Sequence, residues 1–126
     1  MVSLWPALLV GMGGAVGSVA RWLISVLVYD LWKHSIPWAT LMVNLLGCFL
    51  IGLSWGLLGH YGVSPLMKVF VLTGILGGFT TFSTFSLEML FLVRENQWFV
   101  AILTILVSNI GGLLLTALGM MLTHKV

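Results

Sequence analysis

Charged side chains are scarce in this sequence. The chain has 126 residues, of which 5 are Lys or Arg and 3 are Asp or Glu, whereas hydrophobic residues make up 60%. About a quarter of the residues in a soluble domain carry a charge. This chain has too few charged side chains to cover the surface of a soluble fold, so we expect an integral membrane protein. The formal net charge of +2 provides no basic patch, which excludes nucleic acid as a partner.

Cysteine is almost absent as well. The single cysteine, Cys48, lies within an apolar run, so an intramolecular disulfide is excluded and a Cys/His metal site is not expected. His34, His60 and His124 fall near expected loops or the C-terminus, where we interpret them as solvated or interfacial side chains. The sequence offers no combination of nucleophile, base and orienting group, so we do not expect an enzyme.

Long hydrophobic stretches are what the sequence does contain. A helix needs about 20 apolar residues to cross a bilayer, and four stretches reach that length: residues 4–29, 37–59, 66–93 and 98–122. We therefore expect an all-α membrane protein with four transmembrane helices that form a single domain over residues 1–126. Glycines four residues apart predict close packing between these helices. The pairs are Gly13 and Gly17, Gly52 and Gly56, and Gly74 and Gly78.

Positive charge is divided evenly between the two sides of the expected bundle. The side that holds both termini has Lys68 and Lys125. The opposite side has Lys33 and Arg94, together with Arg21 if its side chain reaches that interface. Because the asymmetry of Lys and Arg sets orientation, a chain this balanced can insert either way. We hypothesise dual topology with antiparallel pairing of identical subunits; the alternative is that a weak bias still fixes one orientation.

Polar residues occur inside the expected spans, where they are costly and usually face a bundle interior or a water-filled path. They are Arg21, Thr40, Asn44, Thr80, Thr81, Ser83, Thr84, Ser86, Glu88, Thr104, Ser108 and Asn109. One cation and one carboxylate make a poor set for a cation-coupled transporter but suit a path for a small anion. Hydroxyl and amide donors can replace part of the hydration shell of such an anion.

The third stretch carries a double glycine followed by two threonines near its midpoint. Adjacent glycines weaken a helix, and a break at membrane depth is tolerated only where protein or an aqueous cavity surrounds it. We predict a broken helix at residues 77–80. Phe79, Phe82 and Phe85 recur every third residue and are expected to form one stripe on the helix that resumes. Their positive ring edges can face an anion; simple packing is the alternative.

These motifs resemble those of the Fluc (CrcB) family of fluoride ion channels, in its single-domain bacterial form. Residues 74–88 resemble the most specific motif of that family, residues 17–22 its first-span motif and residues 38–47 its second-span motif. The resemblance covers all four spans. Three departures are small. Ser18 and Ala39 stand where Ala and Gly are usual, and Thr104 stands where some members have Tyr, which leaves a pore role for Thr104 open.

The resemblance implies a multi-pass protein of the bacterial inner membrane, surrounded by lipid, that forms an antiparallel homodimer with two pores. It implies a passive, fluoride-selective channel that lets the inside-negative potential expel cytoplasmic fluoride and needs no organic cofactor. The implied pore residues are Phe82, Phe85, Asn44, Ser83, Thr84, Ser108, Glu88 and Arg21. A structural sodium ion at the dimer interface is implied as well, held by the backbone carbonyls of Gly77 and Thr80.

Two other classes of membrane protein remain as alternatives. A small four-helix multidrug or cation antiporter needs a membrane-embedded carboxylate, usually in its first span, but residues 4–29 contain Arg21 and no acid. A non-transporting assembly subunit would use the hydroxyls and Asn44 for hydrogen bonds between helices. That alternative does not explain why so many polar residues follow the glycines of the third stretch.

Overall fold

The computed structural model describes residues 4–31 and 37–123, and within these residues every regular element is a helix. The third and fourth spans each include a π-helical segment, η1 and η2. The elements in chain order are α1 (Trp5–Leu31), α2 (Trp38–His60), α3 (Pro65–Lys68), η1 (Val69–Leu76), α4 (Gly77–Phe79), α5 (Phe82–Arg94), α6 (Trp98–Leu106), η2 (Val107–Gly111) and α7 (Gly112–Thr123). The expected all-α fold is confirmed.

Four of the helical segments are long and apolar enough to cross a membrane. They are Trp5–Leu31, Trp38–His60, Pro65–Arg94 and Trp98–Thr123. Each end lies within two residues of the corresponding boundary that hydropathy indicates. Within an apolar 18-residue window of each span, only 11% to 22% of the residues are buried within the chain, so most of the apolar surface faces outward, as lipid or another copy of the chain would require.

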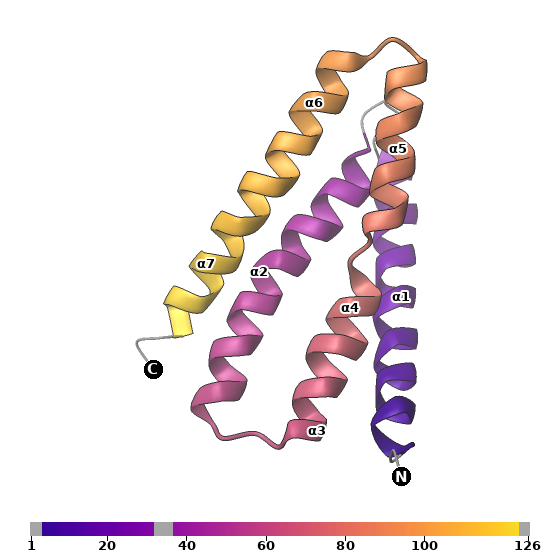
Figure 1. Cartoon of the computed structure of the whole chain (residues 1–126). Helices are drawn as coiled ribbons and strands as arrows, with labels where there is room; N and C mark the ends of the chain where they lie inside the picture. The colour runs from indigo at the N-terminus through magenta and orange to yellow at the C-terminus, as the bar shows by residue number, and fades with distance from the viewer. Residues whose placement is uncertain (1–3, 32–36, 124–126) are drawn as a thin grey trace.

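The spans form an antiparallel bundle (Figure 1). The first and third spans run side by side from the lower end of the molecule, where α1 packs against η1 and α4. The second and fourth spans run the other way, and α2 packs along α7. Lys68 ends α3 and Arg94 ends α5, at opposite ends of the bundle as the charge pattern predicts. Lys33 and Lys125 lie outside the described residues.

Glycines let the first and third spans approach to backbone contact. A methyl group built at Gly13 would lie 2.9 Å from the Cα atom of Gly74, and one built at Gly78 would lie 2.9 Å from the Cα atom of Gly14. Gly52 meets the backbone of Thr116 on α7 in the same way. A larger side chain at these positions would force the helices apart. The close packing predicted from the glycine spacing is therefore confirmed.

A cluster of buried apolar residues joins the third and fourth spans above the break. Phe85, Met89 and Leu92 of α5 pack against Ala101 of α6, with Val93 and Val100 beside them. This cluster fixes the direction of α5 after the third span changes course, and it leaves α5 in contact with α6. The position of α5 matters because its first turn carries four of the eight predicted pore residues.

Candidate functional site

The third span is broken at Thr80 and Thr81. Both residues have extended backbone conformations, with ψ angles of 159° and 123°, and they separate α4 from α5. The double glycine predicts the break at residues 77–80, but Gly77 and Gly78 are helical, so the predicted position is wrong except at Thr80. The physical reason has two parts. Gly78 remains helical because it packs closely against α1. The helix breaks instead where a side chain of another helix can bind the backbone N–H and carbonyl groups that the break leaves without helical partners.

Asn44 of α2 is that side chain. The N–H group of Thr81 donates to Asn44 Oδ1 at 2.8 Å, and Asn44 Nδ2 donates to the carbonyl oxygen of Thr81 at 2.9 Å. The Asn44 amide thus binds both backbone polar groups of Thr81. Without Asn44, these groups would have no hydrogen-bond partner at membrane depth. In a continuous helix the Thr81 N–H would bind the Gly77 carbonyl, so this donor is redirected from Gly77 to Asn44.

Thr81 also begins the helix that follows. Its Oγ1 accepts a hydrogen bond from the Thr84 N–H at 3.3 Å and donates to Thr84 Oγ1 at 3.2 Å, while Ser83 Oγ lies 3.4 Å away. This is the N-cap arrangement that threonine favours. In a continuous helix the Thr84 N–H would bind the Thr80 carbonyl. Because of the break, the carbonyl oxygens of Gly77 and Thr80 do not receive the N–H donors that a continuous helix would supply.

Two cavities meet at this break. One, of about 280 Å³, is polar on several sides and is lined by Ser18, Arg21, Trp22, Ser25, Thr40, Val43, Thr81 and Thr84. The other, of about 290 Å³, is lined by Asn44, Gly47, Cys48, Ile51, Leu72, Leu76, Gly77, Thr80, Thr81 and Phe82. We call the first the arginine cavity and the second the break crevice. Thr81 lines both, so the break forms part of the wall between them.

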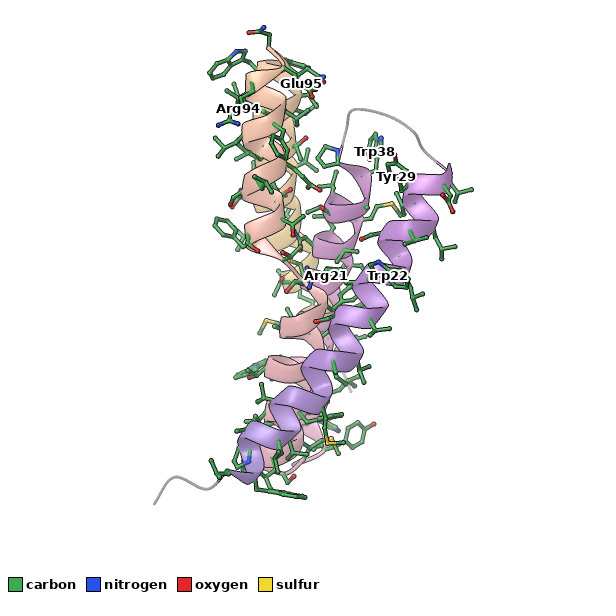
Figure 2. All side chains as sticks on the ribbon, turned by 90° about the vertical axis from the view of Figure 1, so that its right-hand side faces the viewer. Arg21, Trp22, Tyr29, Trp38, Arg94 and Glu95 are labelled. Carbon is green, nitrogen blue, oxygen red and sulfur yellow. The ribbon has the colours of Figure 1, made fainter. Side chains whose placement is uncertain are left out.

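Arg21 supplies the positive charge of the arginine cavity. Figure 2 shows it on α1 near mid-height, beside Trp22 and far from Arg94 and Glu95 at the upper end. Its Nε atom is buried and has no hydrogen-bond partner among the described residues. A guanidinium group is always charged and carries five donors. Together with the hydroxyl groups that line this cavity, it can therefore attract and bind an anion.

The aromatic residues do not form the single stripe that their spacing predicts. Phe79 lies before the break in α4 and is buried, whereas Phe82 and Phe85 lie after it in α5. Including Phe79 in the stripe is wrong because the extended residues change the direction of the chain. Phe82 is 80% exposed and Phe85 is 8% exposed. Their ring centroids lie 6.0 Å apart, with a 38° angle between the planes.

Glu88 lies one helical turn further along α5. Its Oε1 atom accepts a hydrogen bond from Thr40 Oγ1 at 2.9 Å, and its Oε2 atom is buried without a partner among the described residues. Ser108 Oγ is also buried and has no hydrogen-bond partner among the described residues. Thr104, by contrast, donates its hydroxyl to the Val100 carbonyl of its own helix at 2.8 Å. Glu88 and Ser108 therefore keep polar capacity for a further ligand, whereas the Thr104 hydroxyl is already used as a donor.

The structure brings some of the predicted pore residues to the two cavities and leaves others elsewhere. Arg21 and Thr84 line the arginine cavity, and Asn44 and Phe82 line the break crevice. The described lining sets do not include Ser83, Phe85, Glu88 and Ser108. The predicted backbone ligands Gly77 and Thr80 do share one crevice. Carbonyl oxygens with redirected donors suit a hard cation, which prefers oxygen ligands.

Thr81, Ser18 and Ser25 line the cavities although the sequence assigned them no site role. Ser18, Arg21 and Ser25 are spaced i, i+3 and i+7 on the first span, which places them on one helix face, and all three line the arginine cavity. That periodicity was visible in the sequence. The double role of Thr81 was not, because its partner Asn44 is 37 positions away.

Comparison with known proteins identifies relatives over nearly the whole chain. Residues 8–120 match the family model described as "CrcB-like protein, Camphor Resistance (CrcB)". A protein of Salinibacter ruber named "Fluoride-specific ion channel FluC" is 46% identical over 116 residues, which cover 92% of this chain and 84% of the relative. A relative with the same name from Legionella pneumophila (strain Paris) is 38% identical, with 96% and 91% covered. One from Parabacteroides distasonis is 40% identical, with 91% and 90% covered.

Proposed function

This chain belongs to the CrcB family, and from that premise we propose that it is a passive, fluoride-selective ion channel. Hydrogen fluoride is a weak acid that crosses membranes uncharged and ionises in the less acidic cytoplasm, where the anion is trapped. A channel lets the inside-negative potential expel it, since moving one charge through 100 mV is worth about 2.3 kcal/mol. Such a channel needs neither ATP nor an organic cofactor.

The observation that carries this proposal is that one residue of the break, Thr81, lines both cavities. The Arg21 guanidinium would attract fluoride from the aqueous side into the arginine cavity. Hydroxyl groups at Ser83 and Thr84 would then replace water around the ion as it passes the start of α5. The second N–H of the Asn44 amide remains to donate to the ion while the first holds Thr81.

Selectivity would arise where the path narrows between aromatic rings. Fluoride is small, and the edges of the Phe82 and Phe85 rings carry partial positive charge. They attract an anion without trapping it as a full charge would, which a conducting path requires. Glu88 and Ser108 would continue the polar track, because each has a buried oxygen without a partner among the described residues.

We propose that the working unit is an antiparallel homodimer with two pores. So little of each span is buried within the chain that one copy leaves its cavities open on a lipid-facing side. Phe82 is exposed at membrane depth in a single copy, and a second, inverted copy would cover it. The even division of Lys and Arg between the two sides supports insertion in both orientations.

A structural sodium ion would lie where two copies meet. Gly77 and Thr80 are the residues that would hold it, and their carbonyl oxygens suit the ion because the usual helical donors bind elsewhere. Two carbonyls from each copy would supply four oxygen ligands. When bound, the ion would balance the partial negative charge of these carbonyls and join the two copies.

Efflux from liposomes tests the proposal directly. Purified protein should release fluoride rapidly and chloride negligibly under the same potential. Phe82→Ile should reduce fluoride efflux, whereas Phe99→Ile should not, although Phe99 is equally exposed, at 77% against 80%. Proton-coupled movement of an aromatic cation without fluoride efflux would overturn the proposal in favour of the antiporter. Equal efflux from both variants would reject the pore role of Phe82.

A further inference from the structure

A third cavity lies away from the break, between the ends of α2 and α7 near the lower end of the bundle (Figure 1). It measures about 330 Å³ and is lined by Trp55, Gly56, Gly59, His60, Met120 and Thr123. We call it the terminal crevice. None of these residues belongs to the arginine cavity or the break crevice, and the proposed fluoride path makes no use of them.

Two glycines with different roles shape the terminal crevice. A side chain at Gly56 would collide with Thr123, whose Cβ atom lies 2.6 Å from the position of the added methyl group. Gly56 therefore lets α7 pack onto α2. A methyl group at Gly59 would meet no atom within 4 Å. Gly59 is thus not needed for helix packing, and its missing side chain leaves free space at the rim of the crevice.

The depth of the terminal crevice in the membrane follows from the ends of the spans. α2 ends at His60, which lines the crevice, so the crevice lies where the hydrocarbon gives way to lipid head groups. Trp55 is 60% exposed there, and tryptophan prefers that interfacial depth. Met121 and Leu122 of α7 are exposed as well and present an apolar surface to acyl chains.

The charges around the terminal crevice favour an ammonium group. The C-terminal end of α2 lies at the crevice, and such an end carries a partial negative charge of roughly half an elementary charge. The face of an indole ring attracts cations, ammonium groups included. No acid is present among the described residues that line the crevice, so a divalent metal ion lacks carboxylate ligands. The exposed ring of His60 offers an N–H donor to an adjacent phosphate.

We propose that the terminal crevice binds the head group of a zwitterionic phospholipid with a primary ammonium group, as in phosphatidylethanolamine. The ammonium would lie against Trp55 and the C-terminal end of α2, and the phosphate would lie beside His60. The volume is near the lower limit of about 300 Å³ for ligand sites, which suits a head group whose acyl chains remain in the bilayer. This inference rests on the membrane location of the spans and not on fluoride conduction.

Native mass spectrometry of the purified, intact protein tests this binding. The protein is titrated separately with phosphatidylethanolamine and phosphatidylglycerol, and retained lipid is counted. The wild-type protein should retain the ethanolamine lipid several-fold more strongly than the glycerol lipid. Gly59→Leu should abolish that preference by filling the free space. Gly11→Leu is the matched control, because a side chain at Gly11 on α1 also meets no atom within 4 Å, and it should retain the preference.

Other results would overturn the proposal. Equal retention of the two lipids, or stronger retention of the glycerol lipid, would contradict the ammonium assignment. A preference that survives Gly59→Leu would place the lipid elsewhere. Loss of the dimer in Gly59→Leu, with no lipid retained by the wild type, would assign the crevice to a second copy of the chain.

A second variant keeps the test independent of how Gly59→Leu folds. Trp55→Leu removes the indole face from an exposed position and should weaken retention of the ethanolamine lipid about two- to fivefold, the size of a cation–π contribution at an exposed site. Unchanged retention would reject the role of Trp55. Fluoride efflux should be normal in both Trp55→Leu and Gly59→Leu, so a failure of the fluoride proposal and a failure of this one would be seen separately.

Discussion

Replacing Asn44 with leucine would remove both hydrogen bonds that hold the break in the third span. The bonds join its amide to the N–H and carbonyl groups of Thr81 at 2.8 and 2.9 Å. Hydrogen bonds between helices in membrane proteins average about 0.6 kcal/mol and reach about 1.7 kcal/mol. Two of them are therefore worth about 1 to 3 kcal/mol. Because 1.4 kcal/mol changes an equilibrium tenfold, we expect the equilibrium constant between the held and released forms of the break to fall about 5- to 150-fold.

Fluoride efflux and hydrogen–deuterium exchange should be measured on the same preparations of this variant. Efflux should fall, by at most the factor by which that equilibrium constant falls, and the amide of Thr81 should exchange faster because its acceptor is gone. Asn109→Leu is the matched control: Asn109 is also an asparagine within a span, but its described hydrogen bond goes to the Ile105 carbonyl of its own helix, at 2.8 Å. Wild-type efflux and exchange in Asn44→Leu would refute the reasoning, and so would equal losses in Asn109→Leu.

Three further substitutions test other parts of the site. Gly78→Ala should destabilise the protein by about 1 to 3 kcal/mol in detergent unfolding, because the added methyl group lies 2.9 Å from the Cα atom of Gly14; Gly11→Ala, which meets nothing, should not. Arg21→Gln should lower fluoride efflux and weaken its dependence on ionic strength, whereas Arg21→Lys should retain part of both, and an unchanged salt dependence in Arg21→Gln would contradict the electrostatic role. Thr40→Val should cost about 1 to 3 kcal/mol of stability, because it removes the hydrogen-bond donor of Glu88 Oε1. A thermal unfolding assay in detergent would detect this loss, and an unchanged unfolding midpoint would show that the Thr40 hydroxyl is dispensable.

Helix positions were predictable because they depend on composition. A run of about 20 apolar residues is required to cross the hydrocarbon, whatever surrounds it. The glycine pairs were equally informative, since close approach of two helices excludes side chains wherever their backbones meet. Gly13 against Gly74, and Gly78 against Gly14, are direct examples. These features follow from the requirements of each helix, or of a pair of helices, and can be recognised locally.

The sequence predicts that the third span is broken, but it does not predict at which residue. The double glycine indicates weakness in the third span, yet weakness alone does not decide which residue leaves the helix. That choice depends on where the freed N–H and carbonyl groups find partners, and the partner here is Asn44 on another helix. Thr81 could not be recognised as the residue common to both cavities for the same reason. Local spacing in the sequence indicates the polar residues but not the contacts that give each one its role.

The unequal exposure of Phe82 and Phe85 bears on how a path could be built. Residues three apart on a helix point about 60° from one another, so a pore inside one chain would be expected to cover both rings similarly. Instead Phe85 is packed against Met89 and Ala101, and Phe82 is exposed. A path with aromatic edges on two sides therefore needs a second copy to face Phe82. The same difference separates two kinds of variant: Phe82→Ile should lose fluoride efflux at unchanged stability, whereas Phe85→Ile should lose efflux and about 1 to 3 kcal/mol of stability, because only Phe85 belongs to the core of its own chain.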